Sequence, residues 1–298
     1  MGRGSAVTRV GISLKPNDQR AAIVLHELQE WLLAKACDVF IDAEIETSVA
    51  EACDARCEHI TLEQMVDRIE LMIVLGGDGT LLHAARQFIG TGTPLLGINL
   101  GRLGFLTDTP IGSMFEVVDE VLAGRLKTEI HFSLHAEIWR KDELLISAKA
   151  MNDAVIERSV HPRMIGFEMY VNNEFVFRMR GDGLILATPA GSTAYALSAG
   201  GPIVHPSVNA ISVVPVCPHT LSNRPILVPA DDDIELHLVE SSLSAALSLD
   251  GQELAALEEG DRVVIRKGAG ITLVYLPDRH YYGVLRSKLH WAGQVETR

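Results

Sequence analysis

The sequence has few cysteines and no long apolar run. Its four cysteines are scattered at positions 37, 53, 57 and 217 without a C-x-x-C pair, a pattern typical of free thiols in a reducing compartment. No apolar stretch approaches the roughly 18 residues that span a bilayer. The first twenty residues contain no apolar segment typical of a secretory signal. We therefore expect a soluble, cytoplasmic protein that does not enter a membrane.

Basic residues are also scarce relative to acidic ones. The chain has 26 Lys and Arg against 39 Asp and Glu, a net charge of −13 with neutral histidines. A negative field repels phosphate backbones and anionic lipids, which disfavours nucleic acid and membrane surfaces as partners. An anionic ligand would have to be met by a local group of cations or by a metal ion.

The chain has enough residues, 298 of them and 47% hydrophobic, to build two domains. In its first part, short apolar runs alternate with helical patterns. We predict strands at 10–14, 39–41, 71–75 and 94–98, and helices at 21–36, 81–88 and 115–122. Alternation of this kind indicates an α/β domain with an open parallel sheet.

The hydrophobic period changes after Gly124. Residues 130–138 alternate with a period of two, which places Ile130 on the apolar face and His131 on the solvent face. Similar alternation leads into and out of two predicted hairpin turns, Asn172–Asn173 and Asp250–Gly251, and only 192–197 has a helical pattern. We predict an α/β domain at 1–125, a mostly-β, sandwich-like domain at 126–270, and a tail at 271–298 that returns to the first domain with a helix at 285–291.

The turn Gly76-Gly77-Asp78-Gly79-Thr80 lies between a predicted buried strand and a predicted helix. The carboxyl end of a parallel strand is where open α/β sheets bind ligands. We expect the glycines to permit positive φ and the close approach of a ligand, and Thr80 to cap a helix whose N-terminus favours phosphate. The alternative is a tight turn in which Asp78 only caps the helix. The sequence lacks G-x-x-x-x-G-K-[ST] and G-x-G-x-x-G, which excludes a P-loop NTPase and disfavours a Rossmann hydride-transfer site.

Two further segments carry polar groups that suit a nucleotide. Residues 182–203 (DGLILATPAGSTAYALSAGGPI) combine an apolar strand with a dense run of small and hydroxyl residues, which suit sugar hydroxyls and base edges better than acid–base chemistry. Asn152 and Asp153 lie at a strand end of the β domain, where an amide and a carboxylate suit an adenine edge and ribose hydroxyls. Each segment also has a purely structural interpretation, a capped short helix for the first and an Asx turn for the second.

Taken together, these motifs resemble the NAD kinase family in its bacterial form. The turn at 76–80 resembles the family's first motif, Asn152–Asp153 its Asn–acidic pair, and 182–203 its long glycine-rich motif. The segments 97–106 (GINLGRLGFL) and 282–291 (YGVLRSKLHW) also resemble family segments, so the resemblance runs over nearly the whole chain. The chain departs from the usual Thr-Pro-Thr-Gly-Ser-Thr at one position, because Ala190 replaces the second Thr and removes one hydroxyl contact.

This resemblance implies transfer of a phosphoryl group from ATP to the 2′-hydroxyl of the adenosine ribose of NAD, giving NADP, by a homodimer or homotetramer. It implies that Asp78 is the proton acceptor and that Asn152 and Asp153 hold the adenine and the ribose. The other nucleotide-binding positions that it implies are Gly79, His83, Arg163, Arg180, Asp182, Ala190, Thr193, Ala194, Tyr195, Ala196, Leu197, Ser198 and Gln252.

Phosphoryl transfer depends on positioning and charge neutralisation more than on covalent chemistry. We expect Arg163 and Arg180 to offset part of the nucleotide charge, and a divalent cation, Mg²⁺, to arrive with the ATP rather than in a dedicated protein site. Two alternatives remain open. A lipid kinase of the diacylglycerol or sphingosine type shares the glycine–aspartate turn but needs a membrane-facing patch that the sequence does not show. A catalytically silent NAD-binding regulator has no use for Asp78.

Overall fold

The computed structural model describes residues 7–16, 18–44, 53–101, 103–125, 127–158, 164–220, 222–240, 245–276 and 279–291. The chain divides into two compact units: unit 1 comprises residues 1–130 and 271–298, and unit 2 comprises residues 131–270. Unit 1 is α/β and unit 2 is mostly β, which confirms the predicted fold class. Within the described ranges, no helix is long and apolar enough to cross a membrane, and the four cysteines are free thiols, as predicted.

Unit 1 is built on a parallel sheet with the strand order β18–β5–β4–β1–β2–β3. Strand β4 is buried along its whole length, because helices cover both faces of the sheet. The strands are β1 (Arg9–Leu14), β2 (Asp38–Asp42), β3 (Glu58–Ile60), β4 (Leu71–Leu75), β5 (Pro94–Asn99), the short β6 (Thr109–Pro110) beside β5, and the end of β18 (Arg262–Tyr275).

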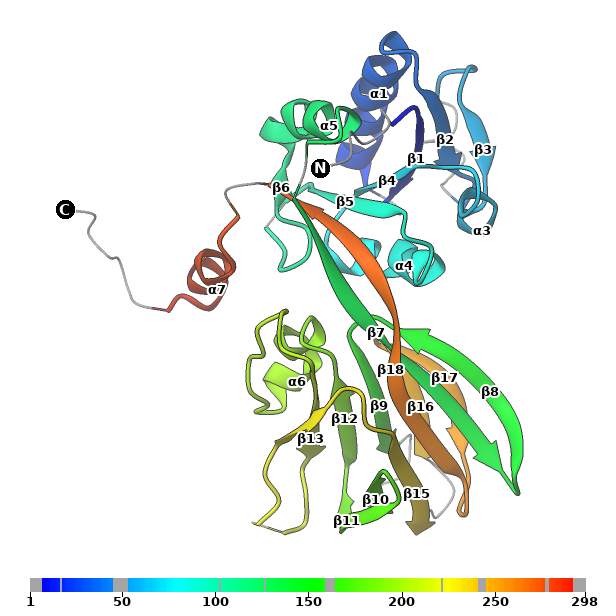
Figure 1. Ribbon diagram of the computed structural model, residues 1–298, viewed down its shortest axis with the longest axis vertical. Coiled ribbons are helices and arrows are strands. Elements are labelled where there is room, and N and C mark those ends of the chain that lie inside the picture. Colours follow the sequence, from blue (N-terminus) through cyan, green and yellow to red (C-terminus); the bar gives the residue numbers. More distant parts are fainter. Residues whose placement is uncertain are drawn as a thin grey trace, which may run out of the picture. The chain divides into compact units, whose positions relative to one another are not determined.

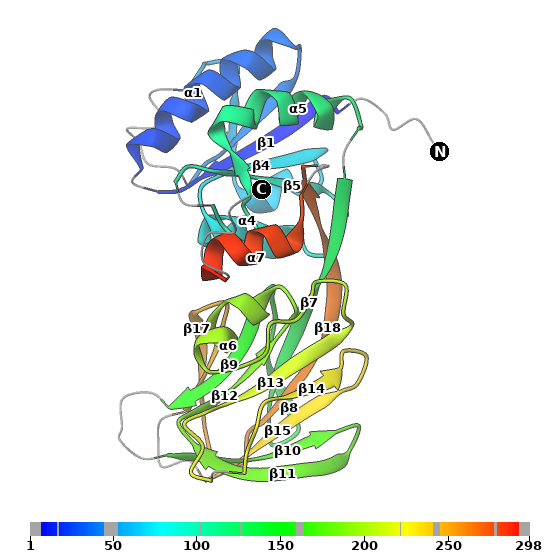
Figure 2. The ribbon, with the colours of Figure 1, turned by 90° about the vertical axis from the view of Figure 1, so that its left-hand side faces the viewer.

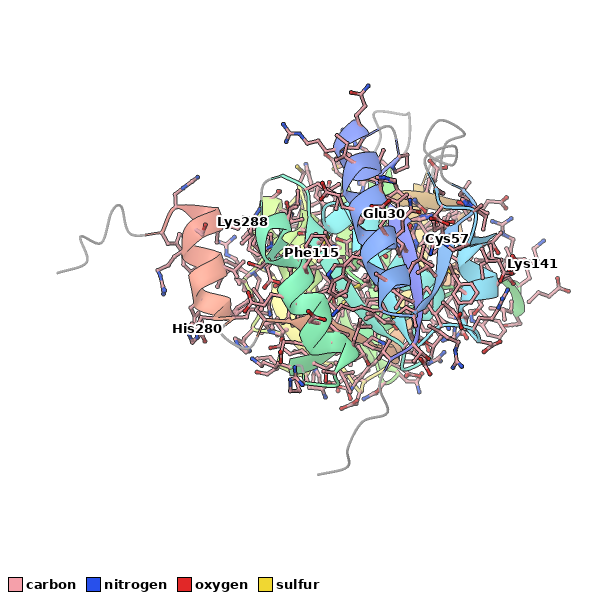
Figure 3. All side chains as sticks on the ribbon, turned by 90° about the horizontal axis from the view of Figure 1, so that it is seen from above. Glu30, Cys57, Phe115, Lys141, His280 and Lys288 are labelled. Carbon is pink, nitrogen blue, oxygen red and sulfur yellow. The ribbon has the colours of Figure 1, made fainter. Side chains whose placement is uncertain are left out.

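The helices α1 (Gln19–Ala34) and α5 (Met114–Leu122) lie next to each other on one face of this sheet, as Figures 1 and 3 show. Their apolar side chains share one core with the strands, and the rings of Trp31 and Phe115 lie 5.4 Å apart. The other face carries α3 (Leu62–Met65) and α4 (Asp78–Phe88). Helix α7 (Tyr281–Leu289) follows β18, so the predicted tail helix exists but begins at Tyr281 rather than Leu285.

Unit 2 consists of antiparallel strands in two layers. One layer has the order β14–β13–β12–β9–β16–β17, and the other contains β11–β10–β15–β18 together with β7 and β8. Apolar side chains of both layers form one core, as in a β-sandwich. The strands are β7 (Lys127–Arg140), β8 (Glu143–Ala150), β9 (Asp153–Arg158), β10 (Ile165–Val171), β11 (Glu174–Gly181), β12 (Gly183–Ala187), β13 (Ala210–Val216), β14 (Ile226–Pro229), β15 (Ile234–Glu240), β16 (Ala245–Leu249) and β17 (Gln252–Leu257).

Both predicted hairpin turns are confirmed. Asn172 and Asn173 connect β10 to β11 with φ of 49° and 66°, and Asp250 and Gly251 connect β16 to β17 with φ of 49° and 75°. Two successive residues with positive φ form the turn that matches the twist of a two-residue hairpin. The second turn fixes the pairing of Leu249 with Gln252.

The predicted alternation at the start of β7 is wrong. Ile130 is 74% exposed, whereas His131 is only 4% exposed and Ser133 is buried. Ser133 faces β18, where its hydroxyl donates a hydrogen bond of 2.8 Å to the carbonyl of Ala269. The neighbouring strand therefore covers Ser133, which we expected in solvent, and the predicted pattern holds only from Leu134 onward.

Candidate functional site

Asp78 is the first residue of α4 and follows β4 and the turn Gly76–Gly77. Its carboxylate accepts four hydrogen bonds from the segment 105–107. Oδ2 accepts from the Phe105 amide at 2.8 Å, while Oδ1 accepts from the Leu106 amide at 3.1 Å and from the amide and the hydroxyl of Thr107, both at 2.9 Å. Asp78 therefore anchors this segment, and among the described residues Oδ2 has a single donor, which leaves it a further lone pair.

The glycines of this turn do not have the positive φ that we expected, while the expected close approach of a ligand remains a prediction. Gly77 has φ of −101°, and Gly76 and Gly79 are not among the residues with positive φ. A side chain at Gly76 would lie 2.4 Å from the Thr80 hydroxyl, whereas Gly77 and Gly79 face open space. Thr80 lies inside α4, which begins at Asp78, so it is not the helix cap that we expected.

Gly104 allows the segment 105–107 to approach Asp78. A Cβ atom at this position would lie 1.9 Å from Asp78 Oδ1 and 2.4 Å from the Thr107 hydroxyl. Only glycine fits at such a distance without displacing the carboxylate. The four hydrogen bonds to Asp78 therefore depend on a residue 26 positions further along the chain (104 − 78).

A pocket of about 360 Å³ opens at the carboxyl ends of β1, β4 and β5. The connections after β1 and β4 lead to opposite edges of the sheet, which makes this the position where open α/β sheets bind ligands. Lys15 forms an ion pair of 3.5 Å with Asp18 at the start of α1. The two cations of the pocket, Lys15 and Arg20, and the turn Gly76–Gly77, which has no side chains, suit an anionic ligand. The lining residues are Lys15, Asp18, Arg20, Gly76, Gly77, Asn99, Leu100 and Gly101.

His83 lies on the outer side of α4 and does not line this pocket. Its Nε2 lies 3.8 Å from a carboxylate oxygen of Glu44, and its Nδ1 lies 3.5 Å from the guanidinium of Arg86. The structure thus gives His83 protein partners on the surface of unit 1. Its predicted contact with a nucleotide remains a prediction.

In unit 2, Asn152 and Asp153 lie at the start of β9, as predicted. Their backbone is held from both sides. The carboxylate of Asp250 accepts from the amides of Met151 at 3.0 Å, Asn152 at 2.7 Å and Asp153 at 3.3 Å. On the opposite side, the Thr188 amide donates to the Asn152 carbonyl at 2.8 Å, and the Thr188 hydroxyl donates to the Met151 carbonyl at 2.8 Å.

The side chains of this pair are buried and chemically unusual. Asn152 is 8% exposed and Asp153 is 4% exposed. Among the described residues, Asn152 Oδ1 has no hydrogen-bond donor although it is buried, and such an acceptor is costly unless a ligand completes it. Burial, together with the negative charge of Asp250, raises the pKa of Asp153 to about 7. Buried groups with displaced pKa values concentrate at functional sites.

The segment 190–198 packs directly on Asn152. It contains a short 3₁₀ turn at Gly191–Thr193 and α6 (Tyr195–Ser198), which lies beside β12 in Figure 2. A Cβ atom at Gly191 would lie 2.1 Å from the Asn152 carbonyl oxygen. The Ser192 hydroxyl closes the turn by donating to the Pro189 carbonyl at 2.6 Å and accepting from the Val204 amide at 3.0 Å.

The predicted residues of this segment differ in their surroundings. Ala190 and Ala196 are buried, Ala196 in a small core with Val155 and Ile185. The Thr193 hydroxyl donates to the Ala190 carbonyl at 3.2 Å. Partial burial raises the pKa of the Tyr195 phenol, and the negative groups near it include Asp153. Ala194 and Leu197 are half-buried, and Ser198 is exposed.

The remaining predicted positions are less tightly grouped. Asp182, between β11 and β12, forms an ion pair of 3.0 Å with Arg158. Arg180 is an exposed residue near the end of β11, and Gln252 is an exposed residue directly after the Asp250–Gly251 turn. Arg163 lies outside the described residues. Within the part of the chain that the structure describes, no group of three His, Cys, Asp or Glu side chains is placed to hold a metal ion.

Sequence reasoning missed the residues that hold the expected site residues in place. Asp250 was recognisable only as half of a hairpin turn and Gly104 only as part of the segment 97–106, and Thr107 was not singled out. Their contacts join positions far apart in the chain, so no local spacing reveals them. The Asp-Gly pair was the one available signal, because it predicts a turn but not which backbone amides the carboxylate will reach.

Two family models match the chain. The ATP-NAD kinase N-terminal domain matches residues 10–126, and the ATP-NAD kinase C-terminal domain matches residues 151–275. The chain belongs to the ATP-NAD kinase family. The motif residues 76–80 and 152–153 lie inside these two matches, in the two polar sites of this family member.

Relatives and solved structures agree with this membership. The chain is 42% identical over 290 residues to an NAD kinase of Magnetococcus marinus, covering 97% of this chain and 95% of that one. It is 44% identical over 288 residues to an NAD kinase of Saccharophagus degradans, covering 96% and 97%. A crystal structure of yeast NADH kinase complexed with NADH has a TM-score of 0.90 at 29% identity, covering 99% of this chain and 91% of that one. An NAD kinase from Archaeoglobus fulgidus in complex with ATP, 24% identical with a TM-score of 0.72, covers 96% of this chain and 100% of that one and shares the fold.

Proposed function

We propose that this chain transfers the terminal phosphoryl group of ATP to the 2′-hydroxyl of the adenosine ribose of NAD, giving NADP and ADP. The observation that carries the proposal is the match of both ATP-NAD kinase domains, over residues 10–126 and 151–275. The geometry supports it independently. In unit 1, Asp78 directly follows Gly77, which lines a pocket with two cations, and unit 2 presents a buried amide–carboxyl pair.

The phosphate donor suits the pocket of unit 1. Lys15 and Arg20 supply positive charge there, and Gly77 leaves open space where a side chain would otherwise stand. Mg²⁺ enters as part of the MgATP substrate, since Mg²⁺ is usually held by phosphate oxygens, waters and one or two carboxylates. Phosphoryl transfer of this kind is dominated by charge neutralisation and positioning.

In this proposal, Asp78 is the proton acceptor. The ribose oxygen forms a bond to the γ-phosphorus, the bond from that phosphorus to the bridging oxygen breaks, and ADP leaves with the bonding electrons. The hydroxyl proton passes to the Asp78 carboxylate, where Oδ2 holds only the Phe105 donor among the described residues. A positioned carboxylate helps a weak hydroxyl nucleophile to attack.

The acceptor suits the pair in unit 2. The buried Asn152 Oδ1 accepts from the adenine amino group, which provides the donor that it lacks among the described residues. Asp153 holds the ribose hydroxyls. We assign supporting contacts with the nucleotides to Gly79, His83, Arg163, Arg180, Asp182, Gln252, Ala190 and residues 193–198, and we place the enzyme in the cytoplasm as a homodimer or homotetramer.

A coupled assay tests this function. The full chain is incubated with NAD, ATP and Mg²⁺, and NADP is detected by a dehydrogenase that uses only NADP. We expect NADP and ADP to form in equal amounts. NAD binding without turnover would identify a silent regulator, and phosphorylation of diacylglycerol or sphingosine in place of NAD would identify a lipid kinase.

A second acceptor belongs in the same assay. The yeast neighbour was solved as an NADH kinase with NADH, and in our proposal Asn152 and Asp153 contact the adenosine half, which NAD and NADH share. The ratio of kcat/KM for NAD to that for NADH therefore reports on contacts with the nicotinamide end. Either ratio is compatible with the contacts that we assign to the adenosine half.

A further inference from the structure

The turn between β16 and β17 is tied to residues 151–153 by four hydrogen bonds, three of which involve the Asn152–Asp153 pair. The carboxylate of Asp250 accepts from the amides of Met151, Asn152 and Asp153 at 3.0, 2.7 and 3.3 Å. The Asp250 amide in turn donates to the Asp153 carbonyl at 3.0 Å. Asp250 is 97 residues from Asp153 in the chain (250 − 153), so the tie is a tertiary contact and not a local turn.

This tie determines where the side chains of Asn152 and Asp153 point. Both oxygens of Asp250 are used, Oδ2 by Met151 and Oδ1 by Asn152 and Asp153. The Asn152 carbonyl is held from the opposite side by the Thr188 amide. With both its amide and its carbonyl engaged, the Asn152 backbone is held in place, and with it the direction in which the side chain that carries the buried Oδ1 leaves the backbone. Preorganisation of this kind lowers the cost of ordering a binding group.

We infer that Asp250 is a positioning residue for the adenosine half of the dinucleotide, acting through the backbone amides of Met151, Asn152 and Asp153. It does so without contacting the nucleotide. The inference rests on the proposed function, because it assigns NAD to the same pair. It adds that the affinity for NAD depends on a carboxylate in a hairpin turn, one residue before the exposed Gly251.

The charge of Asp250 also affects the pH dependence of NAD binding, through the pKa of Asp153. The titratable groups that face Asp153 from the packed elements are Asp250 in the β16–β17 turn and Tyr195 on α6. Burial and the charge of Asp250 raise the pKa of Asp153 to about 7. Removing that charge lowers the pKa of Asp153, so the pH at which NAD affinity changes moves to lower values.

The variant Asp250→Asn tests the inference in the full chain. Asparagine keeps the shape and prefers positive φ, and asparagine before glycine is a preferred pair for a two-residue hairpin. It keeps one acceptor oxygen but turns an NH₂ group toward an amide that needs an acceptor. We expect the Kd for NAD, measured by calorimetry, and the KM for NAD to rise about tenfold or more. We expect the KM for ATP to stay within twofold of the wild type, and the pH profile of NAD affinity to shift to lower pH.

The control is Asp142→Asn, in the exposed turn between β7 and β8, where the φ of 63° is similar. It should change neither NAD affinity nor its pH profile. A folded Asp250→Asn protein with wild-type Kd, KM and pH profile would overturn the inference. A variant that fails to fold would make Asp250 a structural residue and would overturn it as well. If the wild type binds NAD but does not phosphorylate it, the proposed function fails, while calorimetry still decides on Asp250.

Discussion

Asp78 combines two tasks in one side chain. It provides the carboxylate at the end of β4, and it accepts the four hydrogen bonds that fix the segment 105–107. An amide at this position cannot accept on its nitrogen side, so even the isosteric change Asp78→Asn leaves one donor of that segment without its partner. Loss of activity in this variant therefore has two possible sources that must be separated.

We expect Asp78→Asn to lower kcat by about 10²–10⁴-fold, the usual contribution of a general base. We also expect it to lower the free energy of unfolding by about 1–2 kcal/mol, because one backbone amide loses its acceptor. Steady-state kinetics and urea denaturation measure the two effects. The matched variant Thr107→Val removes one donor to Asp78 Oδ1 and keeps the carboxylate. An equal loss of kcat in both variants would assign the effect to the segment and not to the base.

Asp153 gives the protein a pH-dependent stability. Burial and the charge of Asp250 raise its pKa from an ordinary 3.8 to about 7, so the folded state favours the protonated carboxyl more than the unfolded state does. The protonated Asp153 carboxyl therefore contributes to the free energy of unfolding. This contribution is complete below a pH of about 4 and is lost as the pH rises through about 7.

The variant Asp153→Asn removes this titration. We expect its Tm relative to the wild type to increase from pH 5 to pH 8, measured by thermal melts in the absence of nucleotide. Asp142→Asn, in an exposed turn, serves as the control and should show no such trend. A constant difference in Tm across this range would show that Asp153 ionises normally in the folded protein.

At the residue scale, sequence reasoning identified the chemical groups but not their supports. Asp78, Asn152 and Asp153 were recognisable because they stand in short motifs at strand ends. One of the two reasons given for the glycines of the first motif was wrong, since none of them has positive φ and Gly76 serves close packing with Thr80. Asp250 could not be linked to Asn152, because nothing in a single sequence states which amides a distant carboxylate reaches.

The short segment before α6 depends on one glycine that touches Asn152. A Cβ atom at Gly191 would meet the Asn152 carbonyl oxygen at 2.1 Å, and that oxygen belongs to backbone that cannot swing aside. We expect Gly191→Ala to displace the segment or Asn152 and to raise the KM for NAD at least about tenfold, on the scale of one lost polar contact or more.

The control for the variant Gly191→Ala is Gly112→Ala, where no atom lies within 4 Å of the added methyl group. It should leave the KM for NAD and for ATP unchanged. If Gly191→Ala binds NAD as the wild type does, residues 190–198 do not hold Asn152 in its binding position.

At the element scale, helices and strands with one clear hydrophobic period were predictable. A strand that has different neighbours along its length was not. Strands β1, β4 and β5 and helix α5 were found close to their observed bounds, as were both hairpin turns. Strand β18 was not found. It pairs with β15 through its first residues and with β5 through its last, so it has buried residues near both ends, at 263–265 and 273–275, and half-buried or exposed residues at 266–270 between them. No single period describes such a strand.

Arg279 joins the returning end of the chain to the segment that Asp78 anchors. It forms a buried ion pair with Asp108 (side chains 5% and 7% exposed), donates to the Phe105 carbonyl at 2.9 Å and lies over the ring of Tyr275 at 3.6 Å. Burial raises the pKa of Asp108, and the charge of Arg279 opposes that rise. Removing the cation therefore leaves a buried carboxyl without its partner.

We expect Arg279→Met to lower the stability of the whole chain by about 3–5 kcal/mol, the usual cost of breaking a buried pair from one side. Urea denaturation measures it. The control Lys267→Met breaks a pair with Asp231 whose side chains are 34% and 66% exposed and should cost about 1 kcal/mol or less. Similar midpoints for the two variants would show that the Arg279 pair is no stronger than one at the surface.

Unit 1 is divided between residues 1–130 and 271–298, so its two parts are synthesised at different times, with unit 2 between them. All of unit 2 is synthesised before Ile271–Tyr275, which pair with β5 and place the buried Tyr275 ring in unit 1. Until then, Pro94–Leu96 of β5 form an unpaired apolar edge on the nascent chain, because the short β6 pairs only with Ile98 and Asn99, and such an edge invites association with other chains. A nascent chain that lacks residues 271–275 therefore has an unfinished sheet in unit 1, and we expect chaperones that bind open strand edges to bind the first part of this protein until those residues emerge.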